Sequence, residues 1–438
     1  MRRPGLTYAF GDFSLDPRRR RLTSRRSGDA VALNDAAFDT LTFLVEHAGE
    51  VVTREALLAA VWAGRTVVDN SANQAVAAVR RVLGDDPAAP RYVASVTGRG
   101  YRFAAAVAET DRAARDPEAF QHYVAGWSTL TRPGRGNLKT AQAQFERAIA
   151  KDPTFALAHA CLAECHMLQG GHGVLSPHEA YPPAVASARA ALAIDPDCAE
   201  AYAILSHLAS SYDYDIAEAD RFMQRALELD PECFMAHRFH AVQLSSLGRF
   251  EEALAAARRA QAIEPLAASI NGNIAMILFL AGRNEEAIAQ FDHTLQLDSR
   301  WVSAHGMSSV CHAELGDFDR AWERLRHPDA HPLESAWITA LVLAMEGRTE
   351  EARRRLERLM QPADGEFVRP FDAALVHSAL GDTDAALAYI DQVIDQRMNA
   401  MVLAIFPAFR PLHADARFKA RLERLGIGHL EPVPARPI

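Results

Sequence analysis

The sequence has few cysteines and no long hydrophobic run. Its five cysteines are an odd number and all lie after residue 160, which favours reduced thiols over a disulfide framework. The longest apolar stretch, Ile274–Ala281, has 8 residues, whereas a membrane-spanning helix needs roughly 20. The basic start of the chain has no apolar core of the kind that signal peptides carry. We therefore expect a cytoplasmic protein with no membrane partner.

Motifs for catalysis and cofactor binding are also missing. The histidines form no HExxH pattern, and Gly170–Gly173 lacks the Lys-Ser/Thr pair of a phosphate-binding loop. Cys161 and Cys165 are one helical turn apart with histidines nearby, the spacing of a shared metal or redox site. Small residues packed between helices explain this pair more simply. We expect no enzyme activity, no metal and no cofactor, and an enzyme hidden in the helical part is the weakest alternative.

The charge is unevenly distributed along the 438 residues, a length that predicts two or more structural units. Residues 1–110 contain 15 Arg, no Lys and 12 acidic residues, a balance of +3, whereas the remainder has a balance of −12. This asymmetry predicts that only the N-terminal unit meets a polyanion.

The first hundred residues carry the pattern of short strands, three helices and a hairpin. Asn34 and Thr53 are suitable caps for the first two helices. A third helix is expected from Asp69 to Leu83, and Gly84 stands where a helix ends. The alternation of apolar and polar residues predicts strands at Tyr8–Leu15, Val31–Leu33, Arg91–Val96 and Gly100–Ala104.

The third helix has an apolar side and a polar side. At 100° per residue, the core stripe consists of Ala72, Val76, Val79 and Leu83. The opposite side presents Asn70, Ser71, Gln74, Ala77, Ala78 and Arg81, with Asn73 and Arg80 on its flanks. Asn and Gln can hydrogen-bond adenine, and Arg can bind guanine or phosphate. Periodicity alone leaves two interpretations, a surface that reads DNA and a solvated face without a partner.

From residue 118 onward the chain repeats with a period near 34 residues, typical of helix–turn–helix units. The turn glycines are spaced by 34, 34, 31 and 34 residues, and an alanine follows each after five residues. These glycines are Gly248, Gly282, Gly316, Gly347 and Gly381. Prolines end the preceding helices at Pro153, Pro196, Pro231 and Pro265.

Residues 118–397 resemble the tetratricopeptide repeat family, with about eight units. His237 and Asn271 stand where many units of that family carry a large aromatic residue. An insertion at Gln169–Pro183 is expected to lengthen the loop between two helices. Residues 398–438 are expected to form a cap and a tail, with an amphipathic helix that carries Phe418, Leu422 and Leu425.

The N-terminal region resembles the winged-helix domain of OmpR/PhoB-type regulators, in particular their CadC-like and HilA-like branch. The motifs that carry the resemblance are FGDFSLD, GEVVTREAL, Trp62 and GRGYRF, within residues 7–104. The resemblance implies a four-stranded N-terminal sheet, three helices and a hairpin wing. The third helix would enter the major groove of DNA, and the wing at Thr97–Arg99 would touch the minor groove or its phosphates.

The resemblance also implies roles for individual residues. Ser71, Gln74 and Arg80 stand where the family contacts DNA, whereas Ala77 and Ala78 replace arginines of some members. Either Thr97 or Arg99 is the wing contact. Phosphate contacts are expected from Thr53, Arg54, Arg91 and Arg102. The loop Ala63–Val68 resembles the loop that relatives present to RNA polymerase.

We therefore predict a mainly α protein, with an α+β winged helix-turn-helix domain at residues 1–106, a linker at 107–117, and an α-solenoid of tetratricopeptide-type repeats. The predicted function is sequence-specific binding of double-stranded DNA in transcription regulation, in the cytoplasm at the nucleoid. The concave face of the repeats would bind a protein or peptide, or form a homodimer. The alternative is a tetratricopeptide scaffold whose winged domain does not bind DNA.

Overall fold

The chain folds into two units, Met1–Arg115 and Asp116–Ile438. A computed structural model describes the greater part of both units. The residues it describes are 6–17, 21–62, 71–96, 98–111, 116–130, 135–299, 301, 303–327, 330, 332–361 and 369–430.

The first unit contains an antiparallel sheet with the strand order β4-β3-β2-β1-β7. Tyr8 pairs with Leu15 across a turn at Gly11, so the single strand expected over Tyr8–Leu15 is a hairpin. The strands are β1 (Leu6–Phe10), β2 (Phe13–Asp16), β3 (Arg21–Ser24), β4 (Ala30–Val31) and β7 (Ala108–Asp111).

Strand β7 corrects two expectations. It lies within residues 107–117, which we expected to be a linker, and it adds a fifth strand to the four-stranded N-terminal sheet that the resemblance implies. The physical reason is that β1 would otherwise be an edge strand with unpaired backbone groups, and β7 pairs with it from Leu6↔Asp111 to Ala9↔Ala108.

Three helices and a second hairpin complete the first unit. Asn34 Oδ1 accepts a hydrogen bond of 2.9 Å from the amide of Ala37, and Thr53 Oγ1 accepts one of 3.1 Å from the amide of Ala56. Both predicted caps are thereby confirmed. The elements are α1 (Asp35–Glu46), α2 (Arg54–Val61), α3 (Ser71–Leu83), β5 (Val93–Val96) and β6 (Gly100–Phe103).

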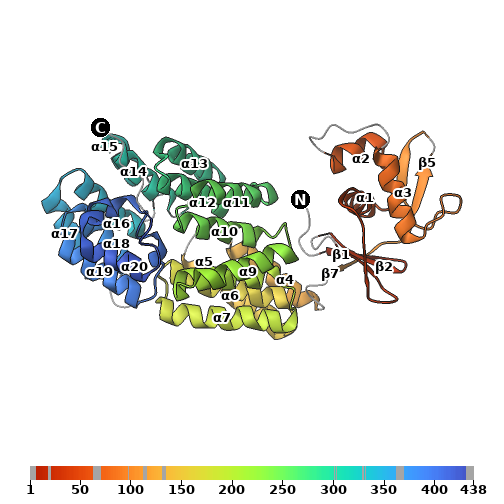
Figure 1. Ribbon diagram of the computed structural model, residues 1–438, viewed down its shortest axis with the longest axis horizontal. Coiled ribbons are helices and arrows are strands. Elements are labelled where there is room, and N and C mark those ends of the chain that lie inside the picture. Colours follow the sequence, from red (N-terminus) through yellow and green to blue (C-terminus); the bar gives the residue numbers. More distant parts are fainter. Residues whose placement is uncertain are drawn as a thin grey trace. The chain divides into compact units, whose positions relative to one another are not determined.

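Among its described residues, the second unit begins with sixteen helices in eight antiparallel pairs, as the repeat spacing predicts. Figure 1 shows how these helices are arranged. The first four pairs are α4 (Pro117–Leu130) with α5 (Arg135–Lys151), α6 (Ala156–Gly171) with α7 (Pro177–Ile194), α8 (Ala199–Leu208) with α9 (Ile216–Leu229), and α10 (Phe234–Ser246) with α11 (Phe250–Ile263). The other four are α12 (Ala268–Leu280) with α13 (Asn284–Leu297), α14 (Ala304–Glu314) with α15 (Phe318–Leu325), α16 (Pro332–Met345) with α17 (Thr349–Leu359), and α18 (Pro370–Ala379) with α19 (Thr383–Asp395).

The inserted residues Gln169–Pro183 do not form the long loop that we expected. They extend α6 to Gly171 and begin α7 at Pro177, so that only five residues join the two helices. A capping box starts α7, because the Glu179 carboxylate accepts from the backbone amide of Ser176 at 3.1 Å. Pro177 fits the first helical turn, where no amide donor is needed.

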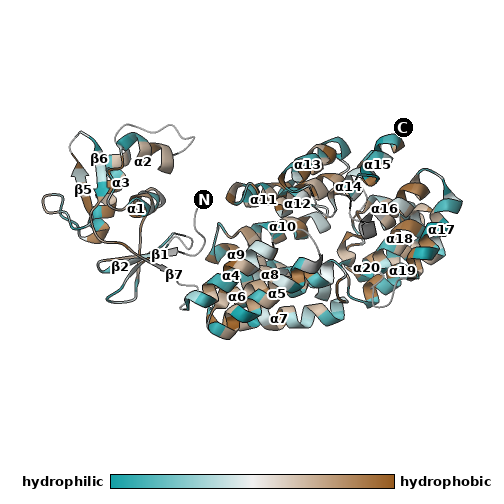
Figure 2. Ribbon diagram, turned by 180° about the vertical axis from the view of Figure 1, so that it is seen from behind, coloured by the Kyte–Doolittle hydropathy of each residue, from teal (hydrophilic) through white to brown (hydrophobic). Residues whose placement is uncertain are grey.

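Polar residues replace the aromatic side chain at the start of two units. His237 Nε2 lies 2.8 Å from the carbonyl oxygen of Pro231, and Asn271 Nδ2 donates to the carbonyl oxygen of Pro265 at 3.1 Å. Each polar group therefore links the first helix of its repeat to the turn before it. Most helices of the second unit show both hydrophobic and hydrophilic residues (Figure 2).

After α19 the chain forms the 3-10 helices η2 (Ala400–Val402) and η3 (Pro407–Ala414) and then α20 (Ala416–Arg424). Phe418 and Leu422 are buried on α20, which confirms its amphipathic character. No helix in the described ranges combines the length and the apolar character needed to cross a membrane.

Candidate nucleic-acid interface

Helix α3 buries one side and exposes the other. Ala72, Ala75, Val76, Val79 and Leu83 are buried against the core of the first unit. Gln74, Ala77 and Arg81 are exposed, and Ser71 and Ala78 are half-buried. The polar side expected from periodicity is thus present, and it bears one amide and one guanidinium that can reach a ligand.

The end of α3 is defined by a glycine and an aspartate. Gly84 has φ +63, and the amide of Asp85 donates to the carbonyl oxygen of Arg80 at 2.8 Å, the hydrogen bond of a Schellman motif. The buried Asp85 carboxylate then accepts from the amides of Arg91, Tyr92 and Val93 at 2.6, 3.1 and 2.7 Å. Asp85 therefore fixes where β5 begins relative to α3. Sequence reasoning missed this role, although an acid directly after a helix-ending glycine was visible.

Arg80 links α3 to the wing, the hairpin β5–β6. Its Nε and Nη2 donate to the carbonyl oxygen of Val93 at 3.1 and 2.7 Å, and Nη2 also donates to Ser95 Oγ at 3.0 Å. Figure 1 shows the corresponding arrangement, with α3 beside β5. Arg80 has an intramolecular role here, and its predicted contact with DNA stays a prediction.

Asn73 and Tyr101 form a second link between α3 and the wing. The Tyr101 hydroxyl donates to Asn73 Oδ1, and Tyr101 also pairs through its backbone with Val52, just before α2. Gly100 has φ +132, and a Cβ atom there would overlap the carbonyl oxygen of Val52. The GRGYRF motif therefore needs glycine at this position because the wing approaches the α2 turn too closely for any side chain.

Four of the remaining predicted contacts are exposed residues of the same unit. Arg99 is exposed in the wing turn, and its amide donates to the carbonyl oxygen of Val96 at 2.9 Å. Arg102 is exposed on β6. Thr53 and Arg54 are exposed at the start of α2. Asn70, Thr97 and the loop Ala63–Val68 lie outside the described residues.

Arg91 differs from these residues because an acid stands beside it. Its Nη2 is 4.0 Å from Asp12 Oδ2, and two thirds of its side chain is exposed (66%). Its guanidinium also lies 5.3 Å from the centroid of the Tyr92 ring. A phosphate would compete with Asp12 for this guanidinium, which makes Arg91 a weaker candidate for a DNA contact than Arg99 or Arg102.

The paired cysteines of the second unit lack the properties of a reactive site. Cys161 and Cys165 are buried, and burial raises the pKa of both thiols, so both stay protonated. Among the described residues, no group of three or more His, Cys, Asp or Glu side chains could hold a metal ion. The candidate functional surface is therefore that of α3 and the wing.

Comparisons with known proteins agree with this geometry. Residues 28–103 match the family described as "Transcriptional regulatory protein, C terminal", and residues 240–300 match the family described as "Tetratricopeptide repeat". Neither is a family of enzymes.

Two curated relatives resemble the N-terminal part alone. One is the transcriptional activator CadC of Escherichia coli (strain K12), 35% identical over 78 residues, which are 18% of this chain and 15% of CadC. The other is the transcriptional regulator HilA of Salmonella typhimurium, 33% identical over 96 residues, which are 22% of this chain and 17% of HilA. The chain thus spans less than a fifth of the length of either relative.

A solved structure is also similar to this region, the RstA DNA-binding domain of Klebsiella pneumoniae in complex with the RstA box. It is 36% identical and covers 22% of this chain and 96% of that chain, with a TM-score of 0.21.

Proposed function

Because the chain joins an OmpR/PhoB-type winged-helix domain to tetratricopeptide repeats, we propose that it is a DNA-binding transcription regulator. The observation that carries the proposal is the surface of α3 and the wing. Gln74 and Arg81 are exposed on α3, while Arg80 and Asn73 hold the wing in a fixed position beside the same helix. A rigid helix with a wing at its side suits a major-groove reader with a second contact.

The roles of the side chains follow from their exposure. Gln74 would read a base edge, and Arg81 would bind guanine or phosphate. Arg54, Arg99 and Arg102 would neutralise phosphates, and Thr53 would bind a phosphate at the start of α2. A single module of this size has a small footprint on DNA, so two copies are expected to bind side by side. The repeats would bind a protein or peptide, or a second copy of the chain.

Genome-wide occupancy of the full chain tests the proposal, with Gln74→Ala/Arg81→Ala as the test variant. Arg26→Ala is a matched control, because Arg26 is exposed in the turn between β3 and β4 and pairs with Asp12. Discrete peaks are expected for the unmodified chain and the control, and their loss is expected for the test variant. On the recovered sites, affinity should fall steeply with salt, because bound phosphates release counterions.

The competing function is a scaffold whose winged domain does not bind DNA. The observation that favours it is the absence of a basic side chain at Ala77 and Ala78 in the middle of the α3 surface. Folded, abundant protein without any occupancy peak would support the scaffold and reject the regulator.

A further inference from the structure

Residues Gln396–Asp415 connect α19 to α20 and enter the core of the second unit. We call this segment the plug. Its apolar side chains are buried almost completely: Met401, Leu403, Ala404, Ile405, Phe409 and Leu412 are each 1% exposed or less. The plug is therefore integrated into the repeats, and it forms the first part of the cap and tail that the sequence predicts for residues 398–438.

The plug packs on the first helices of several earlier units. The Phe406 ring is edge-on to Phe279 of α12 at 5.5 Å and to Phe371 of α18 at 5.7 Å between ring centroids. Arg410 Nη1 forms an ion pair of 2.6 Å with Glu314 Oε2 at the end of α14. Asn399 and Met401 line a small cavity together with residues of α8, η1 (the π-helical turn Ala209–Asp213) and α10.

These contacts add to the packing that the first helices receive from their partners and from the neighbouring units. Ten of the thirteen residues of α10 and ten of the thirteen of α12 are buried. In an open solenoid, each first helix packs on its partner and on the neighbouring units, and its remaining side lines the inner surface. The plug therefore fills what would otherwise be a groove along α8, α10 and α12, which we call the inner groove.

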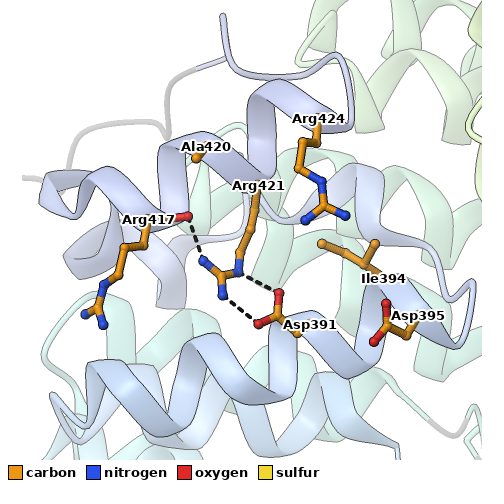
Figure 3. Close-up of a pocket in the computed structure, with 7 residues that line it drawn as sticks. All are labelled: Asp391, Ile394, Asp395, Arg417, Ala420, Arg421 and Arg424. Atoms are coloured by element: carbon orange, nitrogen blue, oxygen red, sulfur yellow. Dashed lines mark hydrogen bonds and ion pairs between the residues drawn. The ribbon is translucent and has the colours of Figure 1, made fainter.

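The plug is a closed loop, because the helices at its two ends hold each other. Arg421 of α20 forms two hydrogen bonds with the Asp391 carboxylate of α19, at 2.7 and 2.5 Å (Figure 3). Arg417 Nη1 also donates to Asp384 Oδ1 at 2.8 Å. The two ends of the plug are therefore joined to each other through α19 and α20.

One end of the plug is held by a contact that we call the clasp, formed by Tyr214, Arg397 and Met398. The Tyr214 hydroxyl donates to the carbonyl oxygen of Met398 at 2.6 Å, and the Arg397 guanidinium lies 5.5 Å from the Tyr214 ring centroid. In the described parts of the chain, Tyr214 and Arg397 are the non-glycine residues with positive φ, at 59° and 53°. Left-handed backbone is unfavourable for residues with a side chain, so the clasp holds strained backbone on both sides.

Polar groups near the clasp are also incompletely satisfied. Gln396 Oε1, Asn399 Oδ1 and His207 Nδ1 are buried without a hydrogen-bond partner among the described residues. Unpaired buried polar atoms and backbone strain both reduce the stability of a contact. The clasp end of the plug is therefore weaker than its middle, where Phe406 and Phe409 pack on aromatic rings.

We propose that the inner groove is a binding groove for an apolar polypeptide segment with aromatic anchors, and that the plug is its resident occupant. The plug opens at the clasp while the repeats stay folded. An occupant from outside would carry the spacing of Phe406 and Phe409, because those rings fill the groove now. This inference rests on the proposed binding of a protein, a peptide or a second copy by the repeats, and it does not depend on DNA binding by the first unit.

Hydrogen exchange of the full chain tests the opening. The variant is Tyr214→Phe, which removes the clasp hydroxyl and keeps the ring. The matched control is Tyr202→Phe on α8, a half-buried tyrosine whose ring contacts Phe222. Amides in residues 398–406 should exchange about 5-fold faster in Tyr214→Phe, the effect of one lost hydrogen bond, while α12 amides are unchanged. The proposal would be overturned if the plug and α12 exchanged at the same rate in all three proteins. It would also be overturned if Tyr214→Phe accelerated exchange in the plug and in α12 equally.

A labelled synthetic peptide of residues 396–415 tests the groove. It should bind Tyr214→Phe about 5-fold more tightly than the unmodified chain or Tyr202→Phe, because the resident plug competes less. The same peptide with Phe406→Ala and Phe409→Ala should not bind. If Tyr214→Phe forms a dimer and the peptide dissociates it, the occupant from outside is a second copy of the chain, and the groove is supported. Absence of peptide binding to every protein, or equal affinity for all of them, would reject it.

Discussion

Arg80 Nη2 donates a 2.7 Å hydrogen bond to the carbonyl oxygen of Val93, thirteen residues away. This contact joins the helix that presents Gln74 and Arg81 to the first strand of the wing. Side chains from within the first unit therefore hold the proposed DNA-binding surface in place. Arg80, one of the basic residues of α3, has this structural role.

Arg80→Ala and Arg81→Ala should have different effects. Arg80→Ala leaves the Val93 carbonyl without its charged donor and is expected to destabilise the first unit by about 1.5–3 kcal/mol. Arg81→Ala should leave stability unchanged, because Arg81 is exposed. Chemical unfolding measures the stability of both variants. DNA binding at several salt concentrations measures what each arginine contributes to affinity.

The salt dependence separates a structural arginine from a phosphate contact. Each lost phosphate contact reduces the slope of log affinity against log salt by about 0.9. We expect this reduction for Arg81→Ala and an unchanged slope for Arg80→Ala. A reduced slope for Arg80→Ala at unchanged stability would show that Arg80 contacts phosphate and that its link to Val93 is dispensable.

Gly100→Ala should unfold the wing. The new methyl group would overlap the Val52 carbonyl oxygen, and φ is +132. We expect a loss of more than about 3 kcal/mol, the combined effect of strain and overlap. Gly28→Ala is the matched control, because Gly28 also has positive φ but has open space around it, and its loss should stay near 1 kcal/mol. Thermal unfolding compares the two, and equal losses would contradict the close approach of the wing to Val52.

Stability of the second unit should decrease in mild acid, and His207 should contribute. Burial, and secondarily the Arg238 guanidinium, lowers the pKa of His207 from 6.5 to about 4. The unfolded chain then binds more protons than the folded chain below pH 6.5. The stability that His207 confers is complete above pH 6.5 and is lost as the pH falls toward 4. Burial also lowers the pKa of His166, His237, His240 and His312.

His207→Gln isolates this contribution. Urea unfolding between pH 7.5 and 4.5 should show a smaller loss of stability for the variant than for the unmodified chain. His429→Gln, a substitution at an exposed histidine, is the control and should follow the unmodified chain. Parallel pH curves for all three proteins would mean that His207 does not titrate differently on folding.

Glu164 and Arg238 form an ion pair between α6 and α10, with side chains only 2% and 12% exposed. Removing one partner leaves a buried charge alone, so Glu164→Ala should destabilise the second unit by about 3–5 kcal/mol. The double variant Glu164→Leu/Arg238→Met should lose less, because neither charge remains. Urea unfolding measures both, and a double variant less stable than Glu164→Ala would contradict this reasoning.

The local and periodic features of the fold could be predicted from the sequence. The spacing of the turn glycines near 34 residues predicted eight helix pairs, and the caps at Asn34 and Thr53 are present as predicted. The polar side of α3 also followed from periodicity, because a helix determines by geometry which residues share a face. These features depend on neighbours within a few residues, which the sequence displays directly.

Contacts between distant segments were decided by the tertiary structure alone. Strand β7 forms because β1 offers an unpaired edge about a hundred residues earlier. The plug reaches from Met398 back to Tyr214, a separation of 184 residues, and Arg80 is oriented by a strand that follows it. Such pairings depend on which backbone groups and apolar surfaces remain uncovered once local elements have formed, and no short sequence pattern records that.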